Sequence, residues 1–531
     1  MPDKILLIVI DQFRADCLNG ALADAAPLPN LTALMNDAAC FERHYTVTTP
    51  CGPSRASLLT GLYAMNHRSI RNGTPLSSQH QTVGTHLRSA GYEPLLFGYT
   101  DTSADPSGKH FNDPDLKNYE GLAPGFDEIV RLRFEKPSSW LGYLKSQGYE
   151  LPENYWDLYK ADLSMDTATE LNPHGSPIRS PALYHAQDSD TAFLTDRTIE
   201  ELSARESHPW FSLLTYIRPH PPFVAPAPYH CLIEPESIPD AHRPLSIEQL
   251  ENLHPFYQAY FSEPANQGLY MGYDGKSEAL HAQHVAELRA VYLGLAREVD
   301  DHIGRLLKYL RDSGQYDETL IVVTADHGEM LGDHYLWGKN CPMDAALRVP
   351  LIIRDPKQPA SFGKRISSFT ESVDIAPTLA DWAGTPEQGH YDGKSLIPWL
   401  ANDKPGTWRE HVFFEAELGE PDEATRYQRY WKMPAEQCNY AMLLNDKYKY
   451  VHFNGGIPPM LYKQPIDAST VCNYGSDPAY STELYTMAAS MLDHRMRFAN
   501  QLFSHSKLTE SGLFDNTACH LHTSKDIRQD E

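Results

Sequence analysis

Five short runs of apolar residues set the strongest constraint on the fold. Each run is almost uninterrupted, which is typical of strands that are buried on both faces. Helical patterns separate the runs, and this alternation predicts an α/β fold: a large, mostly parallel or mixed sheet with helices on both faces. The runs are Ile5–Ile10, Glu93–Tyr99, Trp210–Tyr216, Thr319–Thr324 and Pro350–Arg354.

The clearest helical pattern extends from about Gln283 to Leu310, where apolar residues recur at helical spacing along one stripe. Gly314 follows as a stop signal. In sheets of this class, ligands bind beyond the carboxyl ends of the strands. Polar residues that directly follow the predicted strands are therefore the candidate functional residues.

The length of 531 residues is enough for about three or four average domains, but large α/β enzymes keep one central sheet. We therefore expect two: an α/β domain over residues 1–404 and a smaller α+β domain over 405–531. Residues 103–195 and 218–276 are rich in Pro, Gly and aromatic residues, and such long stretches predict insertions that wall a pocket. In the smaller domain, apolar runs around Asn445-Asp446-Lys447 predict a short antiparallel sheet, with a helical and then polar tail.

The charge balance excludes several partners. Lys and Arg number 45 against 70 Asp and Glu, a formal net charge of −25, which disfavours nucleic acids and anionic membrane surfaces. No apolar run approaches the length of a membrane span, and Ile5–Ile10 is too short for a secretory signal. The eight cysteines show no paired spacing. We therefore expect a cytoplasmic protein without nucleic-acid or membrane partners.

The first chemical motif is Cys51-Gly52-Pro53-Ser54-Arg55-Ala56-Ser57-Leu58-Leu59-Thr60-Gly61. Pro53 and Ser54 are predicted to start a helix, which places Cys51 beside a helix N-terminus that favours negative charge. Arg55 follows one helical turn later. Alone, this pattern fits either an activated thiol or a buried structural cysteine.

Two polar pairs follow predicted strands. Asp11-Gln12 comes after the first, and Asp326-His327 comes after the strand ending at Thr324. Three oxygens and one nitrogen suit a hard divalent ion such as Ca²⁺, Mn²⁺ or Mg²⁺. A single carboxylate could instead cap a helix, but two such pairs at strand ends favour a metal site.

Two further side chains are candidates for acid–base and anion-binding roles. His220 lies in Arg218-Pro219-His220-Pro221-Pro222-Phe223, where prolines would hold it in one pose suited to proton transfer to a leaving group. A surface-loop histidine is the alternative. Lys339 lies twelve residues beyond His327, and near a metal it could bind an anionic substrate oxygen, whereas a lone lysine is ordinarily solvated.

Together these motifs resemble the sulfatase branch of the alkaline phosphatase superfamily. The resemblance runs from the Asp11 strand through the Cys51 motif to Asp392-Gly393-Lys394-Ser395-Leu396. In finer detail the chain is similar to bacterial phosphonate monoester hydrolases, which are promiscuous phosphodiesterases. Typical arylsulfatases carry Asp-Asp where this chain has Asp11-Gln12. The other similar features are Met65-Asn66-His67-Arg68 with Asn72, Gly98-Tyr99-Thr100 and the His220 loop.

The resemblance implies a role for each matching residue. A separate maturation enzyme would convert Cys51 to formylglycine, whose hydrate places one oxygen on the metal, with Arg55 stabilising its charge. His220 would protonate the leaving group. The metal, expected to be Mn²⁺ or Ca²⁺, would be held by Asp11, Gln12, residue 51, Asp326 and His327. The substrate's non-bridging oxygens would be bound by Asn72, Tyr99 and Lys339.

The implied chemistry explains why an aldehyde hydrate is useful. One hydroxyl attacks phosphorus or sulfur and forms a covalent hemiacetal ester, and the metal lowers the pKa of that hydroxyl. The second hydroxyl then loses its proton and expels the ester, which restores the aldehyde. The same breakdown works at either centre, so catalytic promiscuity is expected.

Position 101 departs from the family pattern. Related hydrolases carry a hydroxyl residue there and many sulfatases a histidine, whereas this chain has Asp101. A carboxylate would repel a dianion unless it is protonated or engaged by the metal shell or a lysine. Thr102 is the alternative side chain for that role. The tail also lacks full L-Y-D-L and D-P-x-E matches, so its packing or oligomer contacts can differ.

We therefore expect a formylglycine- and metal-dependent hydrolase of phosphonate monoesters and phosphodiesters with sulfatase side activity. The alternative is a sulfatase acting on aryl or small alkyl sulfate esters. A non-catalytic binding module would need a broken metal set or a replaced Cys51, and neither is seen. The resemblance also implies a small anionic ester substrate and a homo-oligomer, a tetramer or dimer.

Overall fold

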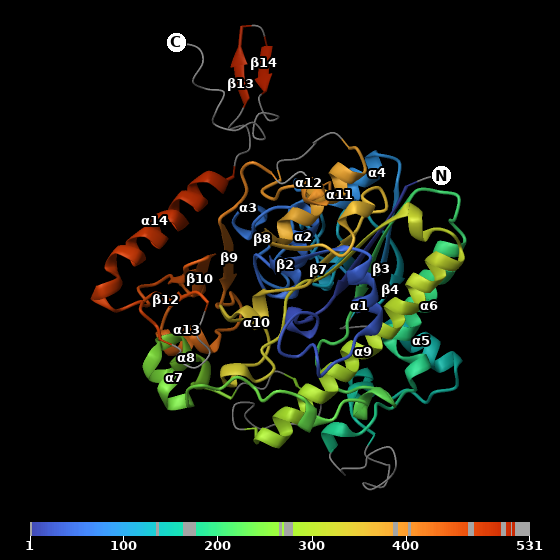
Figure 1. Cartoon of the computed structure of the whole chain (residues 1–531), viewed down its shortest axis with the longest axis horizontal. Coiled ribbons are helices and arrows are strands. Elements are labelled where there is room, and N and C mark those ends of the chain that lie inside the picture. The colour runs from blue at the N-terminus through green and yellow to red at the C-terminus, as the bar shows by residue number, and fades with distance from the viewer. Residues whose placement is uncertain are drawn as a thin grey trace.

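The main sheet of the computed structural model has eight strands in the order β4-β3-β5-β1-β6-β7-β2-β8 (Figure 1). The structure describes residues 3–133, 137–162, 177–264, 268–269, 280–385, 391–401, 405–465, 472–500, 506–510 and 512–515. The strands are β1 Lys4–Ile10, β2 Ala39–Tyr45, β3 Glu93–Gly98, β4 Asp127–Arg131, β5 Trp210–Tyr216, β6 Thr319–Ala325, β7 Leu351–Arg354 and β8 Arg365–Glu371.

The sheet is mixed, as predicted. Strand β1 is parallel to both β5 and β6, whereas β7 is antiparallel to β6 and to β2. The five apolar runs are strands β1, β3, β5, β6 and β7. The sequence did not predict β2, β4 and β8, which lie at or next to the sheet edges and carry charged residues. Because β4 falls within 103–195, that stretch supplies part of the sheet and is not wholly an insertion.

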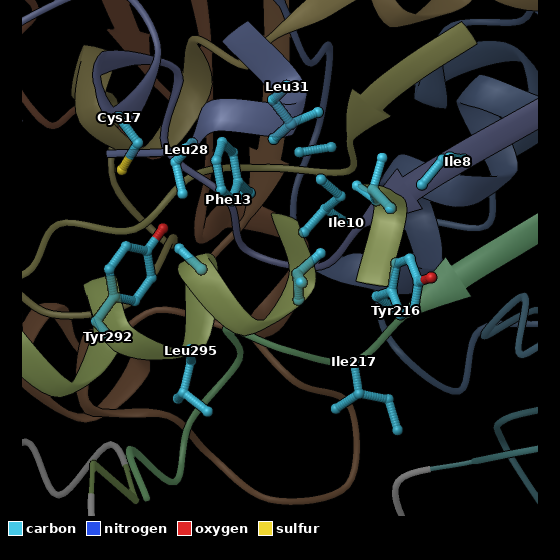
Figure 2. Close-up of a cluster of buried hydrophobic side chains, with 14 of the residues drawn as sticks. Ile8, Ile10, Phe13, Cys17, Leu28, Leu31, Tyr216, Ile217, Tyr292 and Leu295 are labelled. Carbon is cyan, nitrogen blue, oxygen red and sulfur yellow. The ribbon is translucent and has the colours of Figure 1, made fainter. Parts of the chain in front are cut away.

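Helices cover both faces of this sheet. Leu6, Ile8 and Ile10 pack toward α1, α6 and α9, and the alternate side chains of β1 pack toward α2, α4 and α11. Figure 2 shows side chains of the first face, among them Ile8 and Ile10 of β1 and Tyr292 and Leu295 of α9. The helices are α1 Pro29–Asn36, α2 Cys51–Thr60, α3 Ala64–His67, α4 Val83–Ser89, α5 Ser138–Ser146, α6 Asp190–Ser203, α7 Ile247–Leu253, α8 Pro255–Phe261, α9 Ala282–Asp312, α10 Asp344–Leu347, α11 Ile375–Trp382, α12 Ile397–Leu400, α13 Arg426–Trp431 and α14 Ser481–Phe498.

A smaller antiparallel sheet, in the order β12-β11-β10-β9, confirms the predicted C-terminal hairpin. Helices α7 and α8 pack on one face and α14 on the other (Figure 1). The boundary after residue 404 stays a prediction, since residues 402–404 lie outside the described residues, as do 516–531 of the tail and parts of both predicted insertions. The C-terminal strands are β9 His411–Glu417, β10 Asn439–Asn445, β11 Tyr448–Phe453, β12 Met460–Lys463, β13 Ser506–Thr509 and β14 Gly512–Asp515.

The cysteines in the described part of the chain are all free thiols, in line with their scattered spacing. Cys519 lies outside the described residues. Within the described ranges, no helix combines the length and apolar character needed to cross a membrane.

Candidate active site

Neighbouring strands bring the two predicted polar pairs together. Strands β1 and β6 are parallel, with Ile10 opposite Ala325, so Asp11 and Asp326 leave the sheet side by side at its carboxyl edge. The backbone N–H of Gln12 donates to Asp326 Oδ1 at 3.1 Å. Helix α2 places Cys51 at the same edge. Residues far apart in the sequence therefore meet at one point, as the strand-end argument predicted.

The meeting point has the composition of a cation site. Ligand atoms of Asp11, Cys51, Asp326 and His327 all lie within 4.8 Å of one another, and all four residues are buried. His327 Nδ1 lies 3.1 Å from the Gly328 carbonyl, which places its proton there and leaves the Nε2 lone pair for the cluster. Burial and then the nearby Asp326 carboxylate raise the pKa of Asp11. One divalent ion fits these donors and would relieve the repulsion.

Arg55 links the carboxylates of Asp11 and Asp326. Its guanidinium donates to Asp326 Oδ2 at 3.1 Å and to Asp11 Oδ2 at 3.2 Å, with every partner almost fully buried. The Tyr99 hydroxyl accepts from Arg55 at 2.9 Å and itself donates to Asp11. In this structure Tyr99 is thus held by the charged cluster.

Cys51 lies in the first turn of α2, which begins two residues before the predicted start at Pro53. Its sulfur is 3.1 Å from His327 Nε2 and 3.4 Å from Lys339 Nζ. Burial and then the Asp11 carboxylate raise the pKa of the Cys51 thiol well above its ordinary value. Without a bound cation, the protein's own groups therefore disfavour a thiolate, despite the helix N-terminus and Arg55.

Glu329 is a site residue to which the sequence argument gave no role. It accepts from the Gln12 side-chain amide through one oxygen, and from the backbone N–H groups of Leu331 and Gly338 through the other, at 3.0 and 2.7 Å. The Gln12 amide nitrogen is thereby committed to Glu329, and its Oε1 accepts from Lys339 Nζ at 2.8 Å. The only sequence signal was its position in the Asp-His-Gly-Glu string after a strand.

Replacing Glu329 with glutamine is expected to weaken metal binding by about 10- to 100-fold, the usual effect of losing an outer partner of a metal ligand. The oxygen of the new glutamine would keep accepting from the backbone N–H groups of Leu331 and Gly338, so its NH₂ group would face Gln12. Gln12 would then have to turn its oxygen toward residue 329 and its own NH₂ group toward the Lys339 ammonium, where two donors would meet. Titration of the metal-stripped protein with Mn²⁺ and Ca²⁺ measures the change. Equal affinities in both proteins would contradict this role for Glu329.

A cavity of about 370 Å³ opens beside the cluster, with Gln12, His220 and Lys339 along its wall. Tyr260, Glu263 and Leu269, from the predicted 218–276 insertion, also line it. No lining residue in the described part of the chain comes from 103–195, so a wall formed by that stretch stays a prediction. Further lining residues come from β9, α13 and the segment between them, including Glu417, Glu420, Arg426 and Arg429.

His220 has a defined orientation at this wall. Its Nδ1 lies 2.6 Å from the Pro221 carbonyl, which assigns the ring proton to Nδ1, and its Nε2 lies 3.3 Å from Lys339 Nζ. Burial and then the Lys339 ammonium lower the pKa of His220 well below its ordinary value. The ring is therefore neutral here, and Nε2 faces the lysine as an acceptor.

Of the remaining predicted residues, Asn72 and Asp101 lie beside Gly52, the neighbour of Cys51, whereas Thr102 bonds within its own loop. Asn72 Oδ1 accepts from the Gly52 N–H at 2.9 Å, while the Thr102 hydroxyl donates to the Thr100 carbonyl at 3.2 Å. Burial and then the nearby Glu120 raise the pKa of Asp101 to about 8. A carboxyl with this pKa is mostly protonated at neutral pH, which removes the repulsion expected from an aspartate. Substrate binding by these residues stays a prediction.

The family model named Sulfatase matches residues 3–385. The chain belongs to the sulfatase family. A second model, the C-terminal part of N-sulphoglucosamine sulphohydrolase, matches residues 332–497. The sulfatase-type fold, with its alkaline phosphatase-like relatives, identifies the chain as an ester hydrolase.

Individual relatives cover almost the whole chain. The multifunctional alkaline phosphatase superfamily protein PehA of Trinickia caryophylli is 35% identical over 517 residues, covering 96% of this chain and 98% of PehA. A solved phosphonate monoester hydrolase from Silicibacter pomeroyi is 44% identical with a TM-score of 0.90, over 97% and 99% of the two chains. The phosphonate monoester hydrolase of Agrobacterium radiobacter is 35% identical, with the same TM-score and coverage.

Proposed function

We propose that this sulfatase-family hydrolase cleaves phosphonate monoesters and phosphodiesters, with sulfate esters as slower substrates. One arrangement carries the proposal: Lys339 contacts Gln12, Cys51 and His220, and it lines one cavity together with Gln12 and His220. The likeness to two proteins named phosphonate monoester hydrolases, over nearly their full lengths, supports the choice of ester class.

The proposal includes a modified residue and a bound metal ion. Residue 51 would be formylglycine, and a divalent ion, Mn²⁺ or Ca²⁺, would bind Asp11, Gln12, Asp326 and His327. When bound, these groups supply a nucleophilic hydroxyl and a Lewis acid. Arg55 keeps the two carboxylates in place and offsets negative charge that develops beside residue 51.

Lys339 and His220 act on the substrate side. The Lys339 ammonium lines the cavity and lies 3.4 Å from the Cys51 sulfur, so it is placed to bind a non-bridging oxygen of the ester. The same ammonium is within 3.3 Å of His220 Nε2. This pair can deliver a proton to the leaving oxygen through His220 Nε2, because Nδ1 is committed to the Pro221 carbonyl.

Burial of Cys51 bears on its conversion. The residue is only 5% exposed and the surrounding α2 residues are buried, so a separate maturation enzyme would have to reach it before the fold closes. Such an enzyme, assembly into a dimer or tetramer, and a cytoplasmic location all remain parts of the proposal.

The deciding experiment compares kcat/KM for an aryl phosphonate monoester, a diaryl phosphate and an aryl sulfate with the same leaving group. We expect the two phosphorus esters to exceed the sulfate by about tenfold or more, about 1.4 kcal/mol in transition-state binding. The identical phenolate makes the comparison depend on the transferred group alone. A sulfate ester ahead by orders of magnitude would replace this proposal with the sulfatase alternative.

A further inference from the structure

The loop that carries His220 has few backbone N–H donors of its own. Residues 219, 221 and 222 are prolines, which lack an N–H donor, so their segment cannot form a regular backbone ladder. The chain enters this loop from β5 through Ile217, seen in Figure 2. Buried carbonyl oxygens in such a segment need donors from elsewhere in the protein.

Arg218 supplies those donors. Its Nη1 donates to the His220 carbonyl and to the Pro222 carbonyl, each at 3.1 Å. These two carbonyls flank the Pro221 carbonyl, which lies 2.6 Å from His220 Nδ1 and sets the orientation of the ring. The Arg218 guanidinium therefore fixes the carbonyls on either side of the Pro221 carbonyl, which orients the His220 ring.

The guanidinium is itself held from outside the loop. Its Nε lies 3.3 Å from Asp190 Oδ2, at the first turn of α6, and the two side chains are only 0% and 2% exposed. Its plane lies near the Tyr159 ring, with 5.0 Å from the guanidinium carbon to the ring centre. Because the pair is shielded from water, loss of either charge would leave the other uncompensated.

We propose that Arg218 and Asp190 are positioning residues that hold His220 in the orientation needed to protonate the leaving oxygen. This inference rests on the proposed function of His220. In that step, His220 Nε2 takes a proton from the Lys339 ammonium and passes it to the ester oxygen as the bond from that oxygen to phosphorus or sulfur breaks, so a neutral alcohol departs and Lys339 is left as the free amine. A displaced ring would leave the oxygen to depart as an anion.

The test uses the dependence of rate on the leaving group. Esters with a good leaving group, such as 4-nitrophenolate, need little protonation, whereas phenyl and alkyl esters need much. In Arg218→Lys and Asp190→Asn we expect kcat/KM to fall about 10- to 100-fold for the poor leaving groups and within about threefold for 4-nitrophenyl esters. His220→Asn should show the same selective loss.

A double variant separates positioning from general damage. If Arg218 acts through His220, adding Arg218→Lys to His220→Asn should cost little more than His220→Asn alone. Arg179→Lys is the matched control, because Arg179 is also a buried arginine that donates to two carbonyls, those of Cys231 and Ile233, away from the site. It should not change the leaving-group dependence.

Equal losses for good and poor leaving groups, or additive losses in the double variant, would overturn the inference. If Arg218→Lys does not fold, Asp190→Asn provides the same comparison. The leaving-group comparison is made with phosphonate esters and with sulfate esters in parallel. If the proposed ester class is wrong, the sulfate esters react faster, but the difference between good and poor leaving groups still tests whether Arg218 positions His220. Loss of metal content in a variant would also count against a role confined to His220.

Discussion

Replacing Cys51 with alanine is expected to lower kcat/KM for an aryl phosphonate monoester by on the order of 10⁴-fold or more, as removal of a nucleophile does in enzymes whose catalytic residues act as a unit. Cys51 lies in the first turn of α2, within the cluster of Asp11, Asp326 and His327 and 3.4 Å from Lys339, and alanine removes its only functional group. Steady-state kinetics of purified protein measures the loss.

The accompanying mass spectrum identifies the chemical form of residue 51. The Cys51 motif and the sulfatase-family match lead us to expect an aldehyde, not a thiol, in the active protein. Cys40→Ala is the matched control, because Cys40 has the same 5% exposure but lies on β2 at a distance from the cluster. An intact thiol at residue 51 in fully active enzyme would contradict the formylglycine proposal.

The central strands could be predicted from the sequence because both of their faces are buried. Strands β1, β5 and β6 carry apolar residues on successive positions, a pattern that is legible without any tertiary information. Strands β2 and β8 mix buried and solvent-facing residues, including Glu42, Arg43 and Arg365. Their pairing in one sheet depends on neighbours that the local pattern does not specify.

The same distinction applies to the site. Asp11 and Asp326 could be placed because they directly follow parallel strands, whose carboxyl ends share one edge. The roles of Glu329 and Arg218 could not be predicted from the sequence. Glu329 acts through Gln12, which is distant in the chain, and Arg218 acts through side-chain bonds to carbonyls of the His220 loop that no sequence pattern indicates. The charge state of Asp101 likewise depends on its burial and on Glu120, which only the folded structure reveals.

The Asp326→Asn variant is expected to lose metal affinity by about 100-fold or more, because even outer partners of metal ligands are worth 10- to 100-fold. Asp326 contributes a carboxylate to the cluster and also anchors Arg55 and the Gln12 backbone. Asparagine keeps the shape but removes the charge that attracts the cation. Metal content of the purified protein and titration after chelation with Mn²⁺ and Ca²⁺ measure the effect, and activity should fall in parallel.

Asp300→Asn is the control for removing a buried carboxylate. Asp300, on α9, accepts from the backbone N–H groups of Asn30 and Leu31 at the start of α1 and has no part in the cluster. Its replacement should affect stability without changing metal content. Chelated wild-type protein should also stay folded, because Arg55 remains paired with both Asp11 and Asp326 when no cation is bound. Unchanged metal content and activity in Asp326→Asn would therefore exclude the proposed cation site itself, since a damaged fold could not produce that result.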